Sequence, residues 1–239
     1  MRQTVERASQ PLKYDRPAGL ALNEGYPWAA DKQALAWIPE SSRVLELGCS
    51  TGYMGRYLVQ TKKCSVVGVE QDAASAARAQ AYEKVIVGDL DDPAVLESLP
   101  GSFDVIVCLS ILEHLNDPLD VLRRLKTKLE PQGKLIIALP NIAHWSIRWN
   151  LLLGRFHYQP TGILDETHLR FFNSRTAREL VMKAGYIVQA FSIDPDMGIP
   201  FLQPIIRRIP VIGWPLLWKA YNVFPNLFGY QILIQAGIP

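Results

Sequence analysis

The chain has 239 residues, of which 49% are apolar and 20% charged, so it can bury a full core and is expected to form one domain. Its formal net charge is only +2, with Lys and Arg interspersed among Asp and Glu. This pattern argues against a nucleic-acid partner, because nucleic-acid-binding proteins concentrate basic residues on one face. The three cysteines form no CxxC pair, which favours a reducing, cytoplasmic location.

Neither end of the chain carries a recognisable membrane or export segment. Residues 1–17 are polar and lack the apolar stretch of a signal peptide. The most apolar region, residues 205–228, is interrupted by basic residues and prolines and cannot supply a spanning helix. Its aromatic and basic residues suit a membrane surface, but we favour their packing over the sheet or in a dimer contact.

Short apolar runs alternate with helical or turn-rich stretches over residues 43–139. This rhythm predicts βαβ units and a mostly parallel sheet covered by helices on both faces. The five predicted strands are Arg43–Leu47, Cys64–Glu70, Lys84–Val87, Phe103–Leu109 and Lys134–Leu139. Alanine content and leucine spacing predict helices over Ala73–Ala81 and Pro118–Leu129.

The pattern changes after Pro140. A segment rich in His, Trp, Arg and Phe extends to about Phe172 and is too long for an ordinary connection, so we interpret it as an insertion over the site. A helix then begins after Asn173 or Ser174 and ends near Ala184, before a glycine. Two further strands are predicted, on either side of a Pro-rich insertion: Tyr186–Phe191 and Tyr230–Gln235.

Gly48 and Gly52 directly follow the first strand, where the chain must turn and let backbone N–H groups approach a ligand. The loop differs from the dinucleotide fingerprint, which would need glycines where the chain has Ser50 and Tyr53. It is not a phosphate loop either, because no Gly-Lys-Ser/Thr follows. The pattern predicts a nucleotide-type binding loop for a different ligand.

Acidic residues lie near the ends of the first three strands. Glu46 would suit a ligand with an ammonium or sulfonium group, and Glu70 could accept hydrogen bonds from both hydroxyls of a ribose. Asp89 could accept one from an adenine amino group. Because parallel strands end at one edge, we expect the three carboxylates along one crevice. They could instead be solvated strand ends beside a merely structural turn.

The segment Glu46-Leu47-Gly48-Cys49-Ser50-Thr51-Gly52 resembles the first motif of the class I S-adenosylmethionine-dependent methyltransferases, with Ser50 in place of the middle glycine. Further matches follow in order along residues 43–139: Val69-Glu70 with Asp72, Gly88-Asp89-Leu90, Phe103-Asp104-Val105-Ile106, Leu112-Glu113-His114 and Pro131-Gln132-Gly133-Lys134-Leu135. The resemblance implies an α/β, Rossmann-like, doubly wound seven-stranded sheet of order 3-2-1-4-5-7-6, with an antiparallel last strand, helices on both faces and lid insertions.

The same resemblance implies S-adenosyl-L-methionine as the methyl donor and S-adenosyl-L-homocysteine as the product, in one methyltransferase domain over residues 1–239. Its parts would be an N-terminal helical cap (1–40), a donor-binding core (41–139), a substrate lid (140–172) and a C-terminal part (173–239). The expected donor-binding residues are Glu46, Gly48, Cys49, Ser50, Gly52, Glu70, Gln71, Gly88, Asp89, Leu90, Leu109 and Ser110.

Methyl transfer to oxygen needs a base, and histidine suits that task near neutral pH. Of the four histidines, His114, His144 and His168 are the candidates, and His157 is read as packing or surface. Asn141, Asp165 and Arg170 are candidate substrate-binding residues. Each could instead serve only in capping, at the surface or in a structural hydrogen-bond network. No cluster has clear metal-ligand spacing, so no metal is expected.

The segment from Gly154 to Phe172 is similar to a bacterial subgroup of methyltransferases associated with polysaccharide assembly or labelled methionine-biosynthesis-like. This similarity implies a hydroxyl on a sugar, glycan or other small metabolite as acceptor. An N-methyltransferase acting on a natural-product amine, or a non-catalytic protein of the same fold, remains an alternative. Either a monomer or a homodimer is compatible with the sequence.

Overall fold

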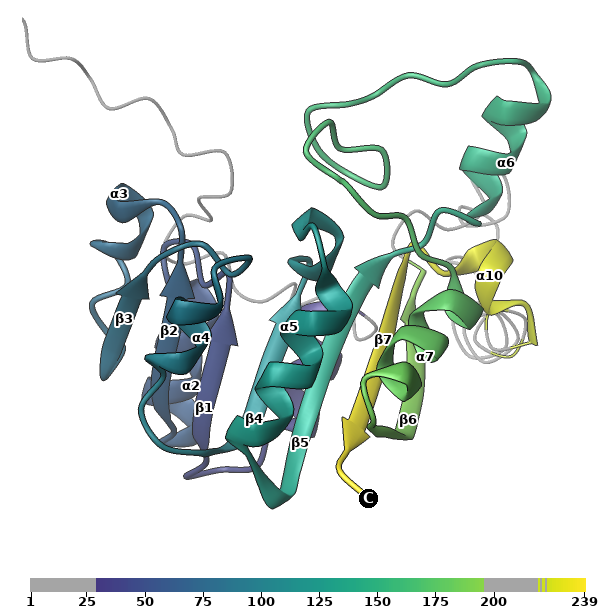
Figure 1. Ribbon diagram of the computed structural model, residues 1–239. Coiled ribbons are helices and arrows are strands. Elements are labelled where there is room, and N and C mark those ends of the chain that lie inside the picture. The colour runs from purple at the N-terminus through teal and green to yellow at the C-terminus, as the bar shows by residue number, and fades with distance from the viewer. Residues whose placement is uncertain (1–28, 196–218, 220, 222) are drawn as a thin grey trace, which may run out of the picture.

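The computed structural model describes residues 29–195, 219, 221 and 223–239, and one seven-stranded sheet organises them. The strand order is β3-β2-β1-β4-β5-β7-β6 (Figure 1). The strands are β1 (Arg43–Leu47), β2 (Ser65–Glu70), β3 (Lys84–Val87), β4 (Phe103–Leu109), β5 (Leu129–Pro140), β6 (Ile187–Asp194) and β7 (Gln231–Gly237). Most of the predicted N-terminal cap and of the Pro-rich insertion lies outside the described residues.

The predicted sheet is confirmed, including its antiparallel edge. Strands β1 to β5 pair in parallel, whereas β7 lies antiparallel between β5 and β6. Strand β5 begins at Leu129 rather than at the predicted Lys134, because Leu129 already pairs with Phe103. The register shifts between Phe103 and Val105, and this irregularity accommodates Pro131-Gln132-Gly133, which belong to the strand rather than to a turn before it.

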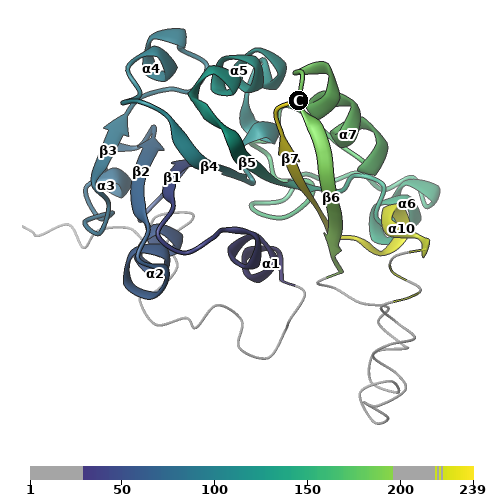
Figure 2. The ribbon, with the colours of Figure 1, turned by 90° about the horizontal axis from the view of Figure 1, so that it is seen from below.

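Helices cover both faces of the sheet (Figure 2). One face carries α1 (Ala30–Trp37), α2 (Tyr53–Lys62) and α3 (Ala73–Ala76), and the other carries α4 (Pro93–Glu97), α5 (Pro118–Leu125) and α7 (Ser174–Lys183). Asn173 caps α7 in a capping box, as the sequence predicts. Two of the predicted helices are longer than the observed ones.

The sequence predicts helix to Ala81, but α3 ends at Ala76, and turns follow that bring Ala79 and Tyr82 inward. The reason is packing, since both side chains are buried against glycines of the α2 region. Helix α5 likewise ends at Leu125 and continues as a 3-10 turn, Lys126–Lys128.

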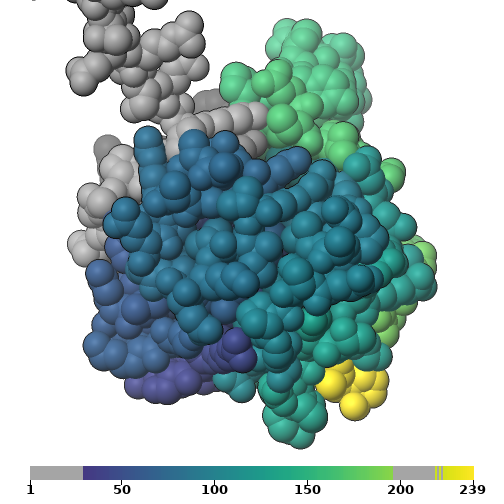
Figure 3. Space-filling model, turned by 60° about the vertical axis from the view of Figure 1, so that its left-hand side comes forward, coloured from purple at the N-terminus to yellow at the C-terminus, as the bar shows by residue number. Residues whose placement is uncertain are grey.

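The segment between β5 and α7 contains one helix that the sequence did not predict, α6 (Trp145–Leu152). It rises above the carboxyl ends of the strands with the loop that follows it (Figures 1 and 3). A small apolar cluster of Ile147, Ile163 and Leu164 holds this segment together. The short helix α10 (Pro225–Phe228) lies beside α6. We call residues 141–172 the lid.

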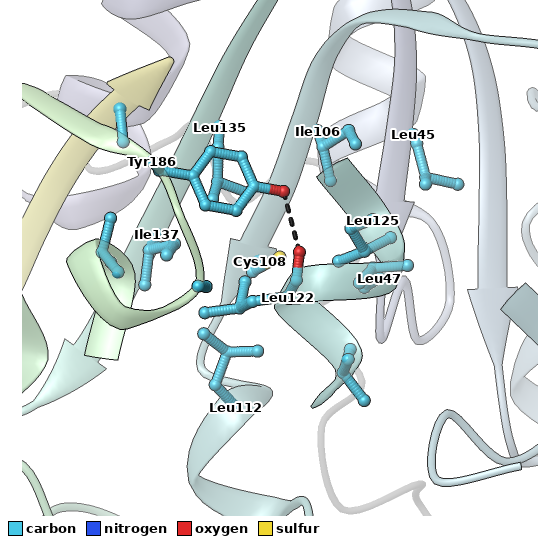
Figure 4. Packing of buried hydrophobic residues seen from close by; sticks show 14 of the residues in the cluster. Leu45, Leu47, Ile106, Cys108, Leu112, Leu122, Leu125, Leu135, Ile137 and Tyr186 are labelled. Carbon is cyan, nitrogen blue, oxygen red and sulfur yellow. Dashed lines mark hydrogen bonds between the residues drawn. The ribbon is translucent and has the colours of Figure 1, made fainter. Parts of the chain in front are cut away.

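The core between the sheet and the helices α4, α5 and α7 is apolar, with few polar groups. Tyr186 enters it between Leu135 and Leu122, and its hydroxyl donates a hydrogen bond of 2.9 Å to the Leu122 carbonyl (Figure 4). A buried phenol is stable in such a place only when its hydroxyl is satisfied. In the part of the chain that the structure describes, no helix has the length and apolarity needed to cross a membrane.

We predict that Tyr186→Phe lowers the free energy of unfolding by about 1 kcal/mol, the net worth of a buried neutral hydrogen bond. The apolar ring stays in place, so circular dichroism should be unchanged. Urea denaturation measures the effect, and Tyr57→Phe is the matched control because Tyr57 is 37% exposed. Equal effects of the two substitutions would contradict this account of the core.

Candidate functional site

A cleft of about 960 Å³ opens at the carboxyl ends of β1, β2, β3 and β4. It lies where the order of the strands reverses, with β2 and β3 on one side of β1 and β4 on the other, which is the usual ligand position in such sheets. Its walls are the loops after these strands and one residue of the lid: Glu46, Leu47, Gly48, Ser50, Tyr53, Val69, Glu70, Gln71, Asp72, Ser75, Gly88, Asp89, Leu90, Asp91, Leu109, Ser110, Ile111, His114, Leu115, Asn116 and Thr167.

The loop after β1 turns through left-handed backbone conformations. Gly48 and Gly52 have φ values of +67° and +78°, which glycine adopts without strain. Ser50 has φ +47°, so the residue in the place of the motif's middle glycine keeps a left-handed backbone. The loop is fixed to β2, because the backbone N–H groups of Gly48 and Cys49 donate to the Val69 carbonyl at 2.9 and 3.1 Å.

Glu70 at the end of β2 holds two loops at once. Its Oε2 accepts a hydrogen bond from the Ser50 N–H at 2.8 Å, and its Oε1 accepts one from the Asp72 N–H at 2.9 Å. Each carboxylate oxygen has more than one lone pair, so both can also accept from a ligand hydroxyl in the cleft. Glu70 therefore positions the loop after β1 while remaining a wall of the cleft.

Glu46 and Leu47 line the cleft at the end of β1. The Tyr82 hydroxyl donates a hydrogen bond of 2.6 Å to Glu46 Oε2 and itself accepts one from the Gly55 N–H at 3.2 Å. Burial raises the pKa of the Glu46 carboxyl to about 8, against a smaller lowering by the Tyr82 hydrogen bond. A cationic ligand group would supply the charge that this buried carboxylate needs.

Hydrogen bonds connect side chains at the rim of the cleft, on the loops after β2, β3 and β4. Gln71 donates its amide to Asp89 Oδ2 at 3.3 Å, and both residues line the cleft. Asp91 accepts hydrogen bonds from the backbone and the side-chain amide of Asn116. This contact joins the loop after β3 to the loop after β4 and closes the rim.

The lid reaches the cleft through residues 165–170. Asp165 accepts hydrogen bonds from the Thr167 N–H at 2.9 Å and the Thr167 hydroxyl at 2.7 Å. The Arg170 guanidinium donates to the Asn116 carbonyl at 2.5 Å, and the Arg170 N–H donates to the Glu113 carbonyl at 3.0 Å. The lid is thus held against the loop after β4, and Thr167 becomes part of the cleft wall.

His114 lines the cleft, and the lid orients its ring. The His114 Nδ1 lies 3.2 Å from the Thr167 carbonyl oxygen and 3.1 Å from its hydroxyl. His168 stacks edge-on against His114, with ring centroids 4.8 Å apart, but does not itself line the cleft. Asp165 and Arg170 do not line the cleft either.

Glu113 belongs to the Leu112-Glu113-His114 match but was not predicted as a site residue, and it lies beside His168. Its side chain is 1% exposed and its Oε1 is 3.9 Å from His168 Nε2. Burial raises the pKa of Glu113 to about 8, with the nearby Asp165 adding to the effect. We call Glu113, His114 and His168 the lid cluster. The sequence shows that Glu113 and His114 are adjacent. The contact of Glu113 with His168 could not be predicted from it, because that contact depends on how the lid folds.

The remaining candidates lie away from the cleft wall. The Cys49 thiol is buried in the core, and Gly52 begins α2. The Asn141 side chain donates to the carbonyls of Asn226 and Gly229 at 3.0 and 2.6 Å, so it joins the end of β5 to the α10 region.

His144 is fully buried and caps α6, accepting a hydrogen bond from the Ser146 N–H. Burial lowers its pKa to about 4, so the ring is neutral at neutral pH and is a weak base. The structure brings His114 and His168 together and leaves His144 apart from both.

A family model described as a methyltransferase domain matches residues 22–190 of the chain. The ubiquinone biosynthesis O-methyltransferase of Pseudomonas aeruginosa (strain LESB58) is 29% identical over 119 residues, which are 48% of this chain and 49% of that protein. The protein of the same name from Pseudomonas fluorescens (strain SBW25) is 30% identical over 115 residues, 44% of this chain and 49% of that protein. The matched region thus spans about half the length of these relatives.

Solved structures share the fold. A chain of the complex between the Haloferax volcanii Trm112 methyltransferase activator and a methyltransferase has a TM-score of 0.59 at 23% identity, with 89% of this chain and 90% of that chain covered. The magnesium protoporphyrin IX methyltransferase of Synechocystis PCC 6803 with bound S-adenosylhomocysteine has a TM-score of 0.57 at 14% identity, covering 88% of this chain and 82% of that one. At these identities the likeness concerns the fold.

We predict that Glu46→Gln reduces the pH dependence of stability. The folded-state pKa of Glu46 is raised to about 8 from 4.5, so between these values the folded chain keeps a proton that the unfolded chain has lost. Its contribution to stability is fully present below pH 4.5 and is lost as the pH rises to 8.

Urea unfolding at several values between pH 5.5 and 8 measures this effect. The wild type should lose up to about 1.4 kcal/mol more per pH unit than Glu46→Gln. The exposed Glu97→Gln is the matched control and should follow the wild type. Parallel pH profiles for wild type and Glu46→Gln would show that burial does not hold the proton on this carboxyl.

Proposed function

This chain belongs to the family of methyltransferase domains, and from that premise we propose that it uses S-adenosylmethionine to methylate a hydroxyl oxygen of a small molecule or glycan. The observation that carries the proposal is the position of His114. It lines the same cleft as Glu46, Glu70 and Asp89, at the end of β4, opposite the loops after β2 and β3. The cleft thus has one side that suits the methyl donor and another, polar side that suits the molecule to be methylated.

The donor side follows from the three carboxylates. S-Adenosylmethionine, when bound, supplies a methyl group on a sulfonium, and the sulfur leaves with the electrons of its bond to carbon. Glu70 would accept hydrogen bonds from the ribose hydroxyls, because both of its oxygens are already fixed by backbone N–H groups. Glu46 would face the cationic end of the donor, and Asp89 the adenine. Leu90, a buried apolar residue of the cleft wall, would contact the adenine ring.

The acceptor side is formed by His114 and Thr167 in front of the buried Glu113. A hydroxyl oxygen attacking the methyl carbon becomes positively charged until its proton leaves, so polar groups that accept hydrogen bonds favour this nucleophile. The lid is fixed at this corner by hydrogen bonds from the Leu169 and Arg170 N–H groups to the Glu113 carbonyl. The protein's main contribution is to align the hydroxyl with the donor methyl.

Two further observations support oxygen as the methylated atom and a hydroxylated metabolite or glycan as the acceptor. The relatives from Pseudomonas are named O-methyltransferases, although they match only about half of their own length. The segment from Gly154 to Phe172, which resembles glycan-associated methyltransferases, is the same segment that supplies Thr167 to the cleft and His168 to the lid cluster.

We predict that Glu70→Gln weakens the binding of S-adenosylhomocysteine by about 10- to 100-fold, because a charged acceptor of ribose hydrogen bonds is worth about 1.5–3 kcal/mol. Isothermal titration calorimetry measures the dissociation constant. Glu97→Gln, on the exposed surface of α4, is the matched control. Unchanged affinity in Glu70→Gln would remove Glu70 from the donor site.

We predict that the protein transfers labelled methyl groups to hydroxyl acceptors and that His114→Ala lowers this turnover by at least about 100-fold. The screen pairs sugars, sugar nucleotides and phenols with amines of similar shape. His157→Ala is the control, since His157 is exposed in the same lid. Affinity for S-adenosylhomocysteine should remain within about threefold in both variants. Labelling of amines alone would refute oxygen as the methylated atom, and full turnover in His114→Ala would remove His114 from the acceptor site.

A further inference from the structure

The buried carboxylate of Glu113 has no hydrogen-bond donor among the described residues. Neither Oε1 nor Oε2 receives a hydrogen bond, although the side chain is 1% exposed. A buried polar group without a hydrogen-bond partner costs free energy whether or not it is charged. The backbone of Glu113 does not need this side chain, because its carbonyl already accepts the Leu169 and Arg170 N–H groups. The Glu113 side chain is therefore not needed to hold the lid against the loop after β4.

Both neighbouring histidines present a nitrogen lone pair to this corner. The His168 Nδ1 lies 3.0 Å from the Ile163 carbonyl oxygen, which can only accept, so this nitrogen carries the proton. The His114 Nδ1 has the same relation to the Thr167 carbonyl oxygen at 3.2 Å. In each neutral ring Nε2 is then the nitrogen with the lone pair, and for His168 it is the atom that faces Glu113.

Two imidazoles that donate Nδ1–H to backbone carbonyls, next to one carboxylate, form the ligand arrangement of metal centres. A ligating histidine nearly always donates its other ring N–H to a carbonyl or carboxylate, which fixes the tautomer. The Thr167 carbonyl oxygen is itself held in place, because Asp165 accepts hydrogen bonds from the Thr167 N–H and hydroxyl. The outer contacts of a metal site are thus present.

The distances suit a small cation after slight side-chain movement. One ligand atom from each member of the lid cluster lies within 4.8 Å of the others. Tetrahedral ligands about 2.0–2.2 Å from zinc are roughly 3.4 Å apart, and Glu113 Oε1 is already 3.9 Å from His168 Nε2. Binding would therefore require rotation of the three side chains toward a common centre.

We propose that Glu113, His114 and His168 bind a divalent first-row transition metal ion such as Zn²⁺, with one coordination position open to the cleft. Two histidines and one carboxylate leave such a position in catalytic zinc sites, and His114 connects the lid cluster to the cleft. This proposal rests on the proposed function in one respect, because the acceptor hydroxyl is the group assigned to the open position. The positive ion would also compensate the buried Glu113 carboxylate.

Metal binding is tested without any turnover. Tag-free protein is stripped with a chelator, dialysed and titrated with Zn²⁺ against a chromophoric competitor. We expect one equivalent to bind. Glu113→Gln and His168→Gln should each weaken binding by at least about tenfold, the smallest effect seen when even an outer contact is lost. His157→Gln, an exposed histidine of the same lid, should bind as the wild type does.

Co²⁺ provides a readout that does not depend on the folding of any variant. Bound by the lid cluster of the wild type, it should give the intense visible absorption of a four- or five-coordinate ion, and Zn²⁺ should displace it. The absence of saturable binding overturns the proposal, as does binding that is equally strong in wild type and Glu113→Gln. Metal binding without methyl transfer to hydroxyls would refute the proposed acceptor but not the metal site. Methyl transfer to hydroxyls without metal binding would refute the metal site but not the proposed acceptor.

Discussion

The reversal of strand order beside β1 is the constraint on which the site depends. Because β2 and β4 flank β1 and their crossovers run to opposite faces, the loops after these strands diverge and leave a crevice that no side chain of the core fills. Glu70 fixes one wall of this crevice, because its carboxylate accepts a hydrogen bond from the Ser50 N–H and so holds the loop after β1. This side of the cleft is thus built from strand ends and loops joined by backbone hydrogen bonds.

Local sequence patterns predicted most of the sheet, and the motif resemblance pointed to residues that line the cleft. A strand covered on both faces is nearly continuous in apolar residues, so β1, β3 and β4 were predicted with the bounds that the structure has. Ten of the twelve donor-binding candidates line the cleft, and the two exceptions, Cys49 and Gly52, belong to the same loop but face the core and α2. Their proposed roles in binding remain predictions.

The region around His114 and the lid was harder to predict from the sequence, because it depends on contacts between segments far apart in the chain. His144 and Asn141 follow a strand end just as the donor residues do, yet they serve as a helix cap and as a bridge to the α10 region. The contact of Glu113 with His168 exists only because the lid folds back onto the loop after β4. Periodicity likewise could not show that α3 stops early, since Tyr82 leaves the helical path to reach Glu46.

The antiparallel strand β7 has a consequence for the order in which this chain can assemble. It lies between β5 and β6, so β6 has no strand to pair with until β7, the last strand along the chain, is present. The end of β5 also awaits this segment, because the Asn141 N–H donates to the Tyr230 carbonyl. During synthesis the half of the sheet that lines the cleft can therefore form well before the half that supports the lid.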